Sequence, residues 1–241
     1  MNQKNVLDNY ITAYNENFQF SFDNNIILKW YPRRIMDLTN KYLTMLELGV
    51  GHGYTSDMFS NFYSEYVVMD ASPAVLEQFK RQYPNSPAKV YESYFEEYRD
   101  NQKYDIVMMG FILEHVDDPA KVLNHFKQFL KKDGRLFVAV PNAASLHRRI
   151  GNKAGVLDNI MELGKGDIEL GHRRLYTVET LSKELIDCGY TVVRKEGIFL
   201  KPFTTNQMVS LNLPENILAG MCRMGIEYPE LSASLLFEAR L

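Results

Sequence analysis

The sequence predicts an α/β fold, in which a mostly parallel sheet is covered by helices on both faces. Short apolar runs of strand length alternate with segments of helical periodicity, which is the pattern of such a sheet. The 241 residues suffice for one sizeable domain, or for one domain with an insert. Apolar residues make up 46% and charged residues 24%, near the globular average, which disfavours a disordered, collagenous or coiled-coil chain.

The expected strands of the first part of the chain are five apolar runs, at 44–48, 66–70, 88–91, 104–109 and 135–140. Helices between them are clearest at 73–83 and 119–131, and both begin with a proline in the first turn, where its missing N–H is harmless. The second helix is expected to end at the glycine exit Lys132-Asp-Gly134.

The remainder of the pattern is a helix at 178–188, a turn at Gly189 and strands at 191–193 and 234–239. Residues 1–43 precede the pattern and are expected to form two helices, the second restarted by Pro32. This aromatic-rich segment is interpreted as a cap on the sheet, in which Tyr10 and Tyr14 either pack only or also close over a ligand. It could equally serve as a lid or as a dimer surface.

Residues 142–172 interrupt the alternation with five glycines and mixed charges. Because this stretch is long for an ordinary connection, it is expected to be a lid or a binding loop.

Composition restricts the binding partners and the cellular compartment expected for the chain. Its formal net charge is −3, which leaves no global basic field for nucleic acid, although a local basic patch stays open. The two cysteines, Cys188 and Cys222, form no disulfide framework or zinc pattern. No apolar run reaches the length of a membrane helix, and the N-terminus does not look like a signal peptide. We therefore expect a reduced cytoplasmic protein without a membrane segment.

The strongest local signal is Glu47-Leu-Gly-Val-Gly-His-Gly53, between the first strand and a helix. Its glycines allow a tight turn and a close approach of a ligand to the backbone. Asp70 ends the second strand, where a carboxylate can accept both hydroxyls of a ribose. A pyrophosphate is disfavoured, because the spacing is G-x-G-x-G rather than G-x-G-x-x-G and Glu47 would repel it. A nucleoside with an ammonium and a sulfonium suits Glu47 better.

Three further segments follow the glycine motif in order. The second segment is Val67-Val-Met-Asp70-Ala-Ser72-Pro. The third and fourth are Tyr104-Asp-Ile-Val-Met-Met-Gly110-Phe-Ile-Leu-Glu-His115-Val and Leu130-Lys-Lys-Asp-Gly134-Arg-Leu-Phe-Val-Ala-Val-Pro141-Asn142. In this order the four segments resemble class I S-adenosylmethionine-dependent methyltransferases of the small-molecule branch that includes ubiquinone-biosynthesis enzymes. The resemblance covers about residues 44–145. It departs at the third strand, where Tyr91-Glu92-Ser93-Tyr94 replaces the usual Gly-Asp.

The resemblance implies a Rossmann-like sheet of seven strands in the order 3-2-1-4-5-7-6, within a domain spanning 44–241. It implies S-adenosylmethionine as cofactor and S-adenosylhomocysteine as product. The glycine motif would wrap the methionine part of the cofactor, and Asp70 would hold the ribose hydroxyls. Ala71 and Ser72 would lie near the adenine. Gly110 and Phe111 would border the methionine carboxylate and the sulfonium. The implied cofactor residues are Glu47, Gly49, Gly51, Gly53, Asp70, Ala71, Ser72, Ser93, Tyr94, Gly110 and Phe111.

The implied chemistry is an in-line methyl transfer to oxygen or nitrogen of a small polar acceptor, anionic or sugar-linked. His115 is the candidate base, with a structural turn role as the alternative and Glu114 as a weaker candidate. The residues expected near the acceptor are Tyr10, Tyr14, Asn142, His172, Arg173, Arg174 and Lys201. No metal site is expected, because the histidines are sparse and no ligand cluster is evident.

Three other classes stay open. The chain could be a catalytically silent cofactor-binding partner subunit. A nicotinamide-dependent oxidoreductase is disfavoured by the glycine spacing and by Glu47. A nucleic-acid methyltransferase is disfavoured by the net charge and by Gly110-Phe-Ile-Leu, which stands where an Asn/Asp-Pro-Pro-Tyr/Phe motif would be. A small-molecule partner without nucleic acid or membrane, and a homodimer as one assembly, complete the expectations.

Overall fold

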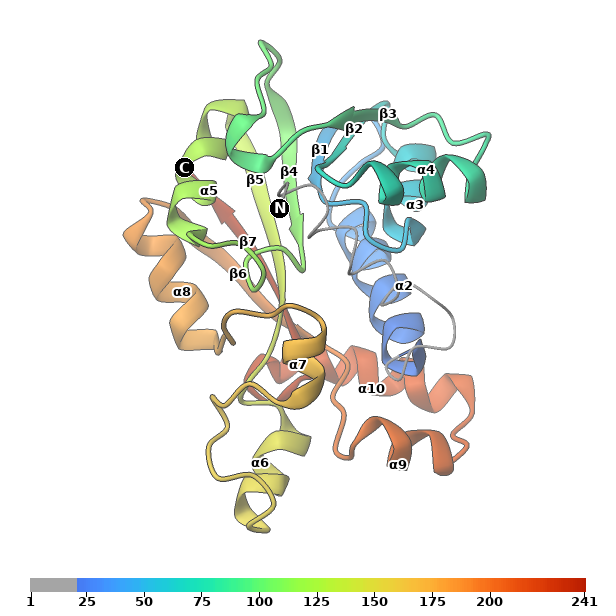
Figure 1. Ribbon diagram of the computed structural model, residues 1–241, viewed down its shortest axis with the longest axis vertical. Helices are drawn as coiled ribbons and strands as arrows, with labels where there is room; N and C mark the ends of the chain where they lie inside the picture. The colour runs from blue at the N-terminus through green and yellow to red at the C-terminus, as the bar shows by residue number, and fades with distance from the viewer. Residues whose placement is uncertain (1–20) are drawn as a thin grey trace.

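A computed structural model describes residues 21–241, and it contains a seven-stranded sheet in the order β3-β2-β1-β4-β5-β7-β6 (Figure 1). The strands β1 to β5 are parallel, whereas β7 runs antiparallel to both β5 and β6. The expected strand order is confirmed. The strands are β1 Thr44–Leu48, β2 Glu65–Asp70, β3 Lys89–Glu92, β4 Tyr104–Gly110, β5 Leu130–Pro141, β6 Thr191–Ile198 and β7 Ser234–Arg240.

Helices cover both faces of the sheet (Figure 1). One face carries α5 and α8, and the other carries α2, α3, α4 and α10. The helices are α2 Ser21–Asp37, α3 Tyr54–Phe62, α4 Pro73–Gln82, α5 Pro119–Phe126, α6 Leu146–Lys153, α7 Lys165–Glu169, α8 Val178–Asp187, α9 Thr205–Ser210 and α10 Glu215–Glu227, with 3₁₀ turns at Phe95–Glu97, Lys127–Phe129 and Pro229–Leu231.

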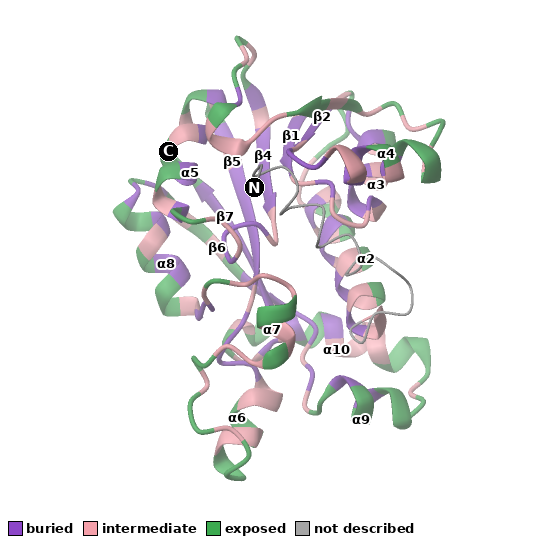
Figure 2. Ribbon diagram, viewed as in Figure 1, coloured by how far each residue is buried: buried purple, intermediate pink, exposed green. Residues whose placement is uncertain are grey.

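The central strands are buried on both faces, as Figure 2 shows. Alternate residues of β1 face opposite cores: Leu46 and Leu48 pack on the side of α5 and α8, and Met45 packs on the side of α2 and α3. Burial of both faces explains the near-continuous apolar runs in the sequence. It also leaves the ends of the strands as the natural place for polar groups.

The N-terminal segment differs from its expectation. Pro32 does not restart a helix but lies inside α2. Pro32 lacks an N–H and so cannot make the usual helical hydrogen bond. Burial of Ile27, Tyr31 and Ile35 against the sheet holds the helix together across it. Residues 1–20, and with them Tyr10 and Tyr14, lie outside the described residues.

Several elements of the later chain also differ. The helix expected to reach residue 131 ends at Phe126, and β5 begins at Leu130 with an irregular register before Arg135, so Gly134 lies in a strand and not in an exit turn. The 142–172 insert contains α6 and α7, and β6 extends to Ile198. Helices α9 and α10 were not expected from the sequence.

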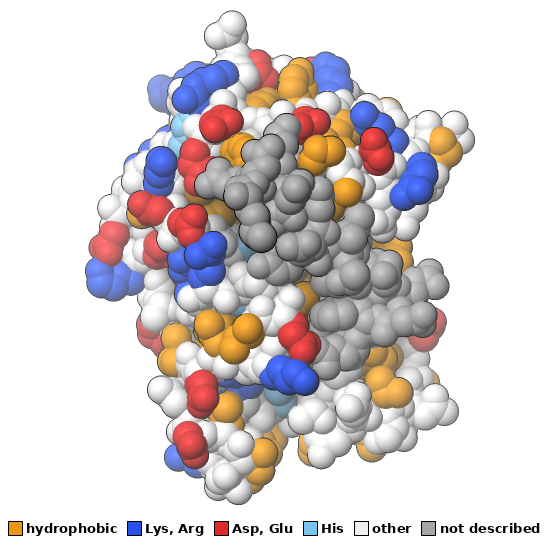
Figure 3. Space-filling model, in the orientation of Figure 1, with side chains coloured by type: hydrophobic (Ala, Val, Ile, Leu, Met, Phe, Trp, Pro, Cys, Tyr) orange, Lys and Arg blue, Asp and Glu red, His pale blue; other side chains and the backbone are white. Residues whose placement is uncertain are grey.

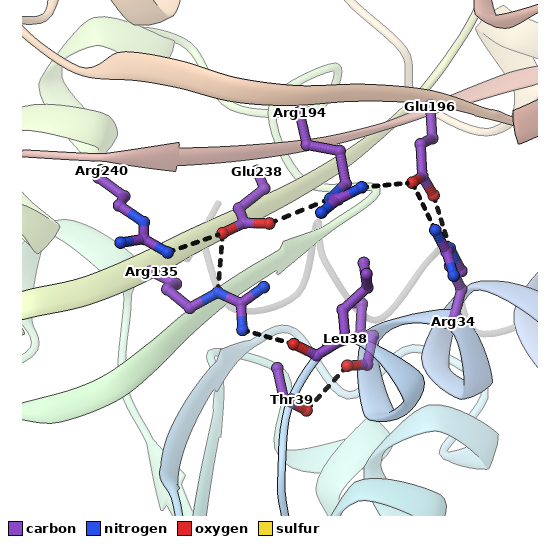
Figure 4. Close-up of polar contacts among 9 residues, drawn as sticks. Arg34, Leu38, Thr39, Arg135, Arg194, Glu196, Glu238 and Arg240 are labelled. Atoms are coloured by element: carbon purple, nitrogen blue, oxygen red, sulfur yellow. Dashed lines mark hydrogen bonds and ion pairs between the residues drawn. The ribbon is translucent and has the colours of Figure 1, made fainter. Parts of the chain in front are cut away.

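An ion-pair network ties α2 to the antiparallel half of the sheet (Figure 4). The Arg34 guanidinium of α2 donates to both carboxylate oxygens of Glu196 at 2.7–2.8 Å. Arg194 bridges Glu196 to Glu238, which also pairs with Arg135 at 2.8 Å. Burial raises the pKa of the Glu238 carboxyl, but Arg135 and Arg194 outweigh this effect and hold the pKa below its usual range. The N-terminal helix and the last strand are thus joined through charge-assisted hydrogen bonds.

The face of the molecule in Figure 3 carries both acidic and basic side chains, and the Lys and Arg side chains of the described residues do not form one basic patch on it. Among residues 21–241, no helix combines the length and the apolar character needed to cross a membrane. Cys188 and Cys222 are buried, free thiols.

We expect Glu238→Gln to lower the free energy of unfolding by on the order of 2 kcal/mol, because it leaves the mostly buried Arg135 without its carboxylate. Urea unfolding at pH 7 measures this effect. Asp187→Asn is the matched control, since it removes an exposed pair with Lys183 and should change stability by less than about 0.5 kcal/mol. Equal effects of the two variants would show that the network contributes no more than a surface pair.

Candidate functional site

The expected cofactor residues converge at the carboxyl ends of the parallel strands. The strand order reverses between β1 and β4, and such a reversal opens a crevice at this edge of a sheet. The glycine loop follows β1, and Gly49, Gly51 and Gly53 all have positive φ, between 52° and 79°. At Gly53 a Cβ atom would lie 2.9 Å from the rings of Phe79 and Tyr83. The loop conformation and its packing therefore both require glycine at this position.

Glu47, the acid of the glycine motif, is buried at the end of β1. Its Oε2 accepts hydrogen bonds from Ser56 at 2.8 Å and from the hydroxyl of Tyr66. Burial raises the pKa of the carboxyl to about 7, although these hydrogen bonds oppose the shift. Part of its hydrogen-bonding capacity is thus already used within the protein. Its contact with the ammonium of a cofactor stays a prediction.

Asp70 closes β2 and shapes the glycine loop. Its Oδ2 accepts from the Val50 amide and its Oδ1 from the Ser72 amide, both at 2.9 Å. The cap of α4 is Ser72, whose hydroxyl accepts from the Val75 amide, so Asp70 does not cap this helix. One carboxylate oxygen thus contacts the glycine loop and the other contacts the start of α4, and the hold on a ribose stays a prediction. Ala71, which follows Asp70, is buried.

The third strand brings Ser93 and Tyr94 to the same edge. The Ser93 amide donates to the Asp70 carbonyl at 3.1 Å, which sets the segment directly beside the end of β2. The hydroxyl of Tyr94 is buried and has no hydrogen-bond partner among the described residues. A buried hydroxyl without a partner is unfavourable, so a ligand with a polar edge would stabilise this place. The adenine role of this segment stays a prediction.

Gly110 ends β4 and Phe111 follows it, and both lie against Tyr31 of α2. A Cβ atom at Gly110 would lie 2.8 Å from the Tyr31 hydroxyl, and Phe111 has φ of 57°. The rings of Tyr31 and Phe111 meet edge to face, with centroids 5.8 Å apart. Burial and the charge of Glu47 raise the pKa of Tyr31 well above its ordinary value. A buried tyrosine of α2, which the sequence did not single out, thus joins the predicted sulfonium side of the site.

The turn after β4 gathers a carboxylate and two imidazoles. Ligand atoms of Glu114, His115 and His172 all lie within 4.8 Å of one another, and the two histidine rings are 4.8 Å apart. Burial raises the pKa of Glu114 to about 8 and lowers that of His115 to about 4. His172 comes from the glycine-rich insert. The sequence did not reveal this cluster, whose groups lie close enough to hold a metal ion.

Two of the residues expected near the acceptor serve internal contacts. The Asn142 amide donates to the carbonyls of Pro229 and Ser232, and its oxygen accepts from the Ala144 amide. Lys201 is 4% exposed and donates to Asp23 of α2 at 2.5 Å and to Thr205 at 3.0 Å. Both side chains thus have structural partners within the fold, and their contact with an acceptor stays a prediction.

Most arginines in and beside the insert donate hydrogen bonds to backbone carbonyls. Arg174, expected at the acceptor, instead donates to the carbonyls of Leu113, Val116 and Asp117 and fixes the turn after β4. Arg148 and Arg149 likewise donate to carbonyls of the insert and its approach. The Arg173 side chain is about half exposed and pairs with the exposed Asp117 at 2.7 Å. Of the expected arginines, Arg173 is the better placed to meet an acceptor.

Fold and strand-end site together define an α/β domain that binds a nucleoside-type ligand beside a glycine loop. The family model described as "Methyltransferase domain" matches residues 27–195. This range is well over half of the chain. The chain therefore belongs to this methyltransferase family, and the resemblance inferred from its motifs is confirmed.

Curated relatives match about half of the chain. The mitochondrial ubiquinone biosynthesis O-methyltransferase of Candida albicans is 34% identical over 117 residues, 46% of this chain and 36% of that protein. The ubiquinone biosynthesis O-methyltransferase of Pelagibacter ubique is 29% identical over 118 residues, 48% of this chain and 49% of that protein. The matches therefore span about half the length of these relatives, or less.

Solved structures share the fold over nearly the whole chain. A 1,6-didemethyltoxoflavin-N1-methyltransferase of Burkholderia thailandensis superposes with a TM-score of 0.63 at 13% identity, covering 98% of this chain and 86% of that one. An S-adenosylmethionine-dependent methyltransferase of Mesorhizobium loti superposes with a TM-score of 0.59 at 18% identity, covering 89% and 98%. At these identities the likeness establishes the fold.

Local motifs could not reveal Tyr31 or the partnership of Glu114 with His172. Tyr31 was visible only as one of several aromatic residues before the first strand. The cluster joins a turn and an insert that are distant in sequence. Asp167 pairs with His172 and is likewise a residue of the insert that no motif marked.

We expect Gly53→Ala to destabilise the protein by more than about 2 kcal/mol and to weaken cofactor binding, because the methyl group would meet two aromatic rings. Gly155→Ala is the matched control: its φ of 70° is similar, but no atom lies within 4 Å of the added Cβ. Thermal unfolding of both variants separates the close contact from backbone strain. Equal losses of stability in the two variants would mean that the left-handed backbone conformation, and not the contact with the rings, causes the destabilisation.

We expect the stability of the wild type to fall relative to Glu47→Gln between pH 5 and pH 8. A buried acid with a pKa of about 7 folds preferentially protonated, so its contribution is present below the unfolded pKa near 4.5 and is lost as pH rises to about 7. At pH 8 the free energy of unfolding of the wild type should have fallen, relative to that of Glu47→Gln, by on the order of 1–3 kcal/mol. Denaturation of the ligand-free proteins across this range tests it, and parallel pH curves would contradict it.

Proposed function

We propose that the chain transfers a methyl group from S-adenosylmethionine to an oxygen or nitrogen atom of a small polar metabolite. The observation that carries the proposal is the convergence of the glycine loop, Asp70 and Gly110 at one edge of the sheet, within a confirmed methyltransferase family. One similar protein is named for ubiquinone biosynthesis and another for N1-methylation of 1,6-didemethyltoxoflavin, and both names refer to small molecules, which supports an acceptor of this size.

In the proposed reaction a lone pair of the acceptor attacks the methyl carbon in line with sulfur. The bond from sulfur to methyl breaks, its electron pair stays on sulfur, and S-adenosylhomocysteine leaves. Alignment supplies most of the acceleration, because the sulfonium is already activated. A hydroxyl or ammonium acceptor must also lose a proton. His115 as the group that removes it stays a prediction.

The direct test is a calorimetric titration of the purified chain with S-adenosylmethionine and, separately, with NADH. Micromolar binding of the first and none of the second supports the proposal. Binding of NADH alone would place the chain among oxidoreductases. A chain that binds S-adenosylmethionine, yet methylates no member of a panel of small hydroxyl and amine acceptors, would instead be a silent partner subunit. Size-exclusion chromatography in the same experiment tests the expected homodimer.

We expect Asp70→Ala to weaken S-adenosylmethionine binding ten-fold or more, about 1.4 kcal/mol, because it removes a two-oxygen acceptor for the ribose. Asp70→Asn keeps one acceptor oxygen and the side-chain shape, so its loss should be smaller. Asp57→Ala, on the neighbouring helix α3, should bind within about two-fold of the wild type. Thermal unfolding controls for the loop contacts that Asp70 also makes. Unchanged affinity of the alanine variant would reject the ribose assignment.

A further inference from the structure

We propose that Glu114, His115 and His172 form a binding site for one divalent transition-metal ion beside the predicted methyl-transfer centre. Their ligand atoms lie within 4.8 Å of one another. Bonds of about 2 Å to a tetrahedral ion would draw them to roughly 3.3 Å apart. Small side-chain rotations are enough for such a closure.

The carboxylate supplies the independent reason to expect a ligand. Glu114 is 1% exposed, and neither of its oxygens has a hydrogen-bond partner among the described residues. Arg174 lies near but donates its protons to three backbone carbonyls. A buried carboxylate without partners is strongly unfavourable unless it is protonated or neutralised. A bound cation would satisfy both oxygens.

His172 is held by an outer acceptor, as metal-binding histidines usually are. Its Nδ1 lies 3.2 Å from Asp167 Oδ1, and Asp167 is itself held by the Gly164 amide at 2.8 Å. This contact leaves Nε2 of His172 for a metal. The backbone amide of His115 donates to the Ile112 carbonyl at 2.9 Å, which holds the residue in the turn after β4. The Arg173 amide donates to the Glu114 carbonyl at 2.8 Å, which fastens the insert to the turn.

Ligand chemistry restricts the ion. Two imidazole nitrogens and one carboxylate suit zinc, iron, manganese or cobalt, whereas magnesium and calcium prefer oxygen ligands. Three protein ligands leave positions open for atoms of a substrate. The site follows β4 directly, so it lies on the same segment of the chain as Gly110 and Phe111, both of which lie close to Tyr31.

Resting on the proposed function, the metal site implies an oxygen acceptor. A hydroxyl that binds a divalent cation ionises more readily, so its proton can pass to solvent without a protein base. The resulting oxygen attacks the methyl carbon as in the proposed reaction. His115 then serves as a ligand, and its predicted role as base falls away.

The test is a Co²⁺ titration of the full chain, without a histidine tag, followed by visible absorption and checked by equilibrium dialysis with Zn²⁺. We expect one ion per chain at micromolar affinity. Glu114→Gln and His172→Asn should each weaken binding at least ten-fold. His125→Asn, on helix α5, is the matched control, because His125 is not part of the cluster and hydrogen-bonds the Tyr98 carbonyl instead; this variant should bind as the wild type does. Absence of stoichiometric binding, or wild-type affinity in both site variants, would overturn the proposal.

Folding and cofactor binding are measured on the same variants. Glu114→Gln preserves the side-chain shape and should retain S-adenosylmethionine affinity within about two-fold, so its loss of Co²⁺ binding reports on the ligand alone. If the wild type binds S-adenosylmethionine but no metal, the metal site fails and the proposed function stands. If it binds metal but not S-adenosylmethionine, the proposed function fails and the site stands.

Discussion

The reversal of strand order between β1 and β4 is the constraint on which the rest of the molecule depends. Parallel strands end at the same edge, and here successive connections leave in opposite directions, so the loops after β1 and β4 part and open a crevice. Both faces of the sheet are covered by helices and filled with apolar side chains. Polar groups are therefore concentrated at the strand ends, where glycines bring backbone close to a ligand.

Two buried glutamates at this edge differ in their hydrogen-bond partners. Glu47 accepts hydrogen bonds from Ser56 and Tyr66, which offset part of its desolvation. Glu114 has no such donors among the described residues. Hydrogen bonds from the protein therefore stabilise Glu47 in part, whereas Glu114 needs a proton or a cation to offset its burial. Of the two acids, Glu114 gains more from an added ligand.

Helix α2 connects the site with the antiparallel half of the sheet. Tyr31 contacts the end of β4, Arg34 pairs with Glu196 of β6, and Asp23 accepts from Lys201 and Thr205. The insert depends on similar contacts, because it lacks a core of its own. Its arginines donate to backbone carbonyls that the irregular chain would otherwise leave without protein partners. The residues that looked most available for an anionic acceptor are thus largely occupied by the fold.

The sequence by itself determined the α/β class, the positions of the first strands and the glycine loop, because hydrophobic period and glycine spacing are local properties. Through its motifs it also identified the family and the strand order. It could not determine that Pro32 lies inside a helix, because burial of Ile27, Tyr31 and Ile35 against a distant sheet outweighs the local effect of proline. The grouping of Glu114 with His172 and the internal pairing of Lys201 were likewise decided only by tertiary structure. In each case the interacting groups come from elements distant in sequence, and their free energy depends on burial that exists only in the folded chain.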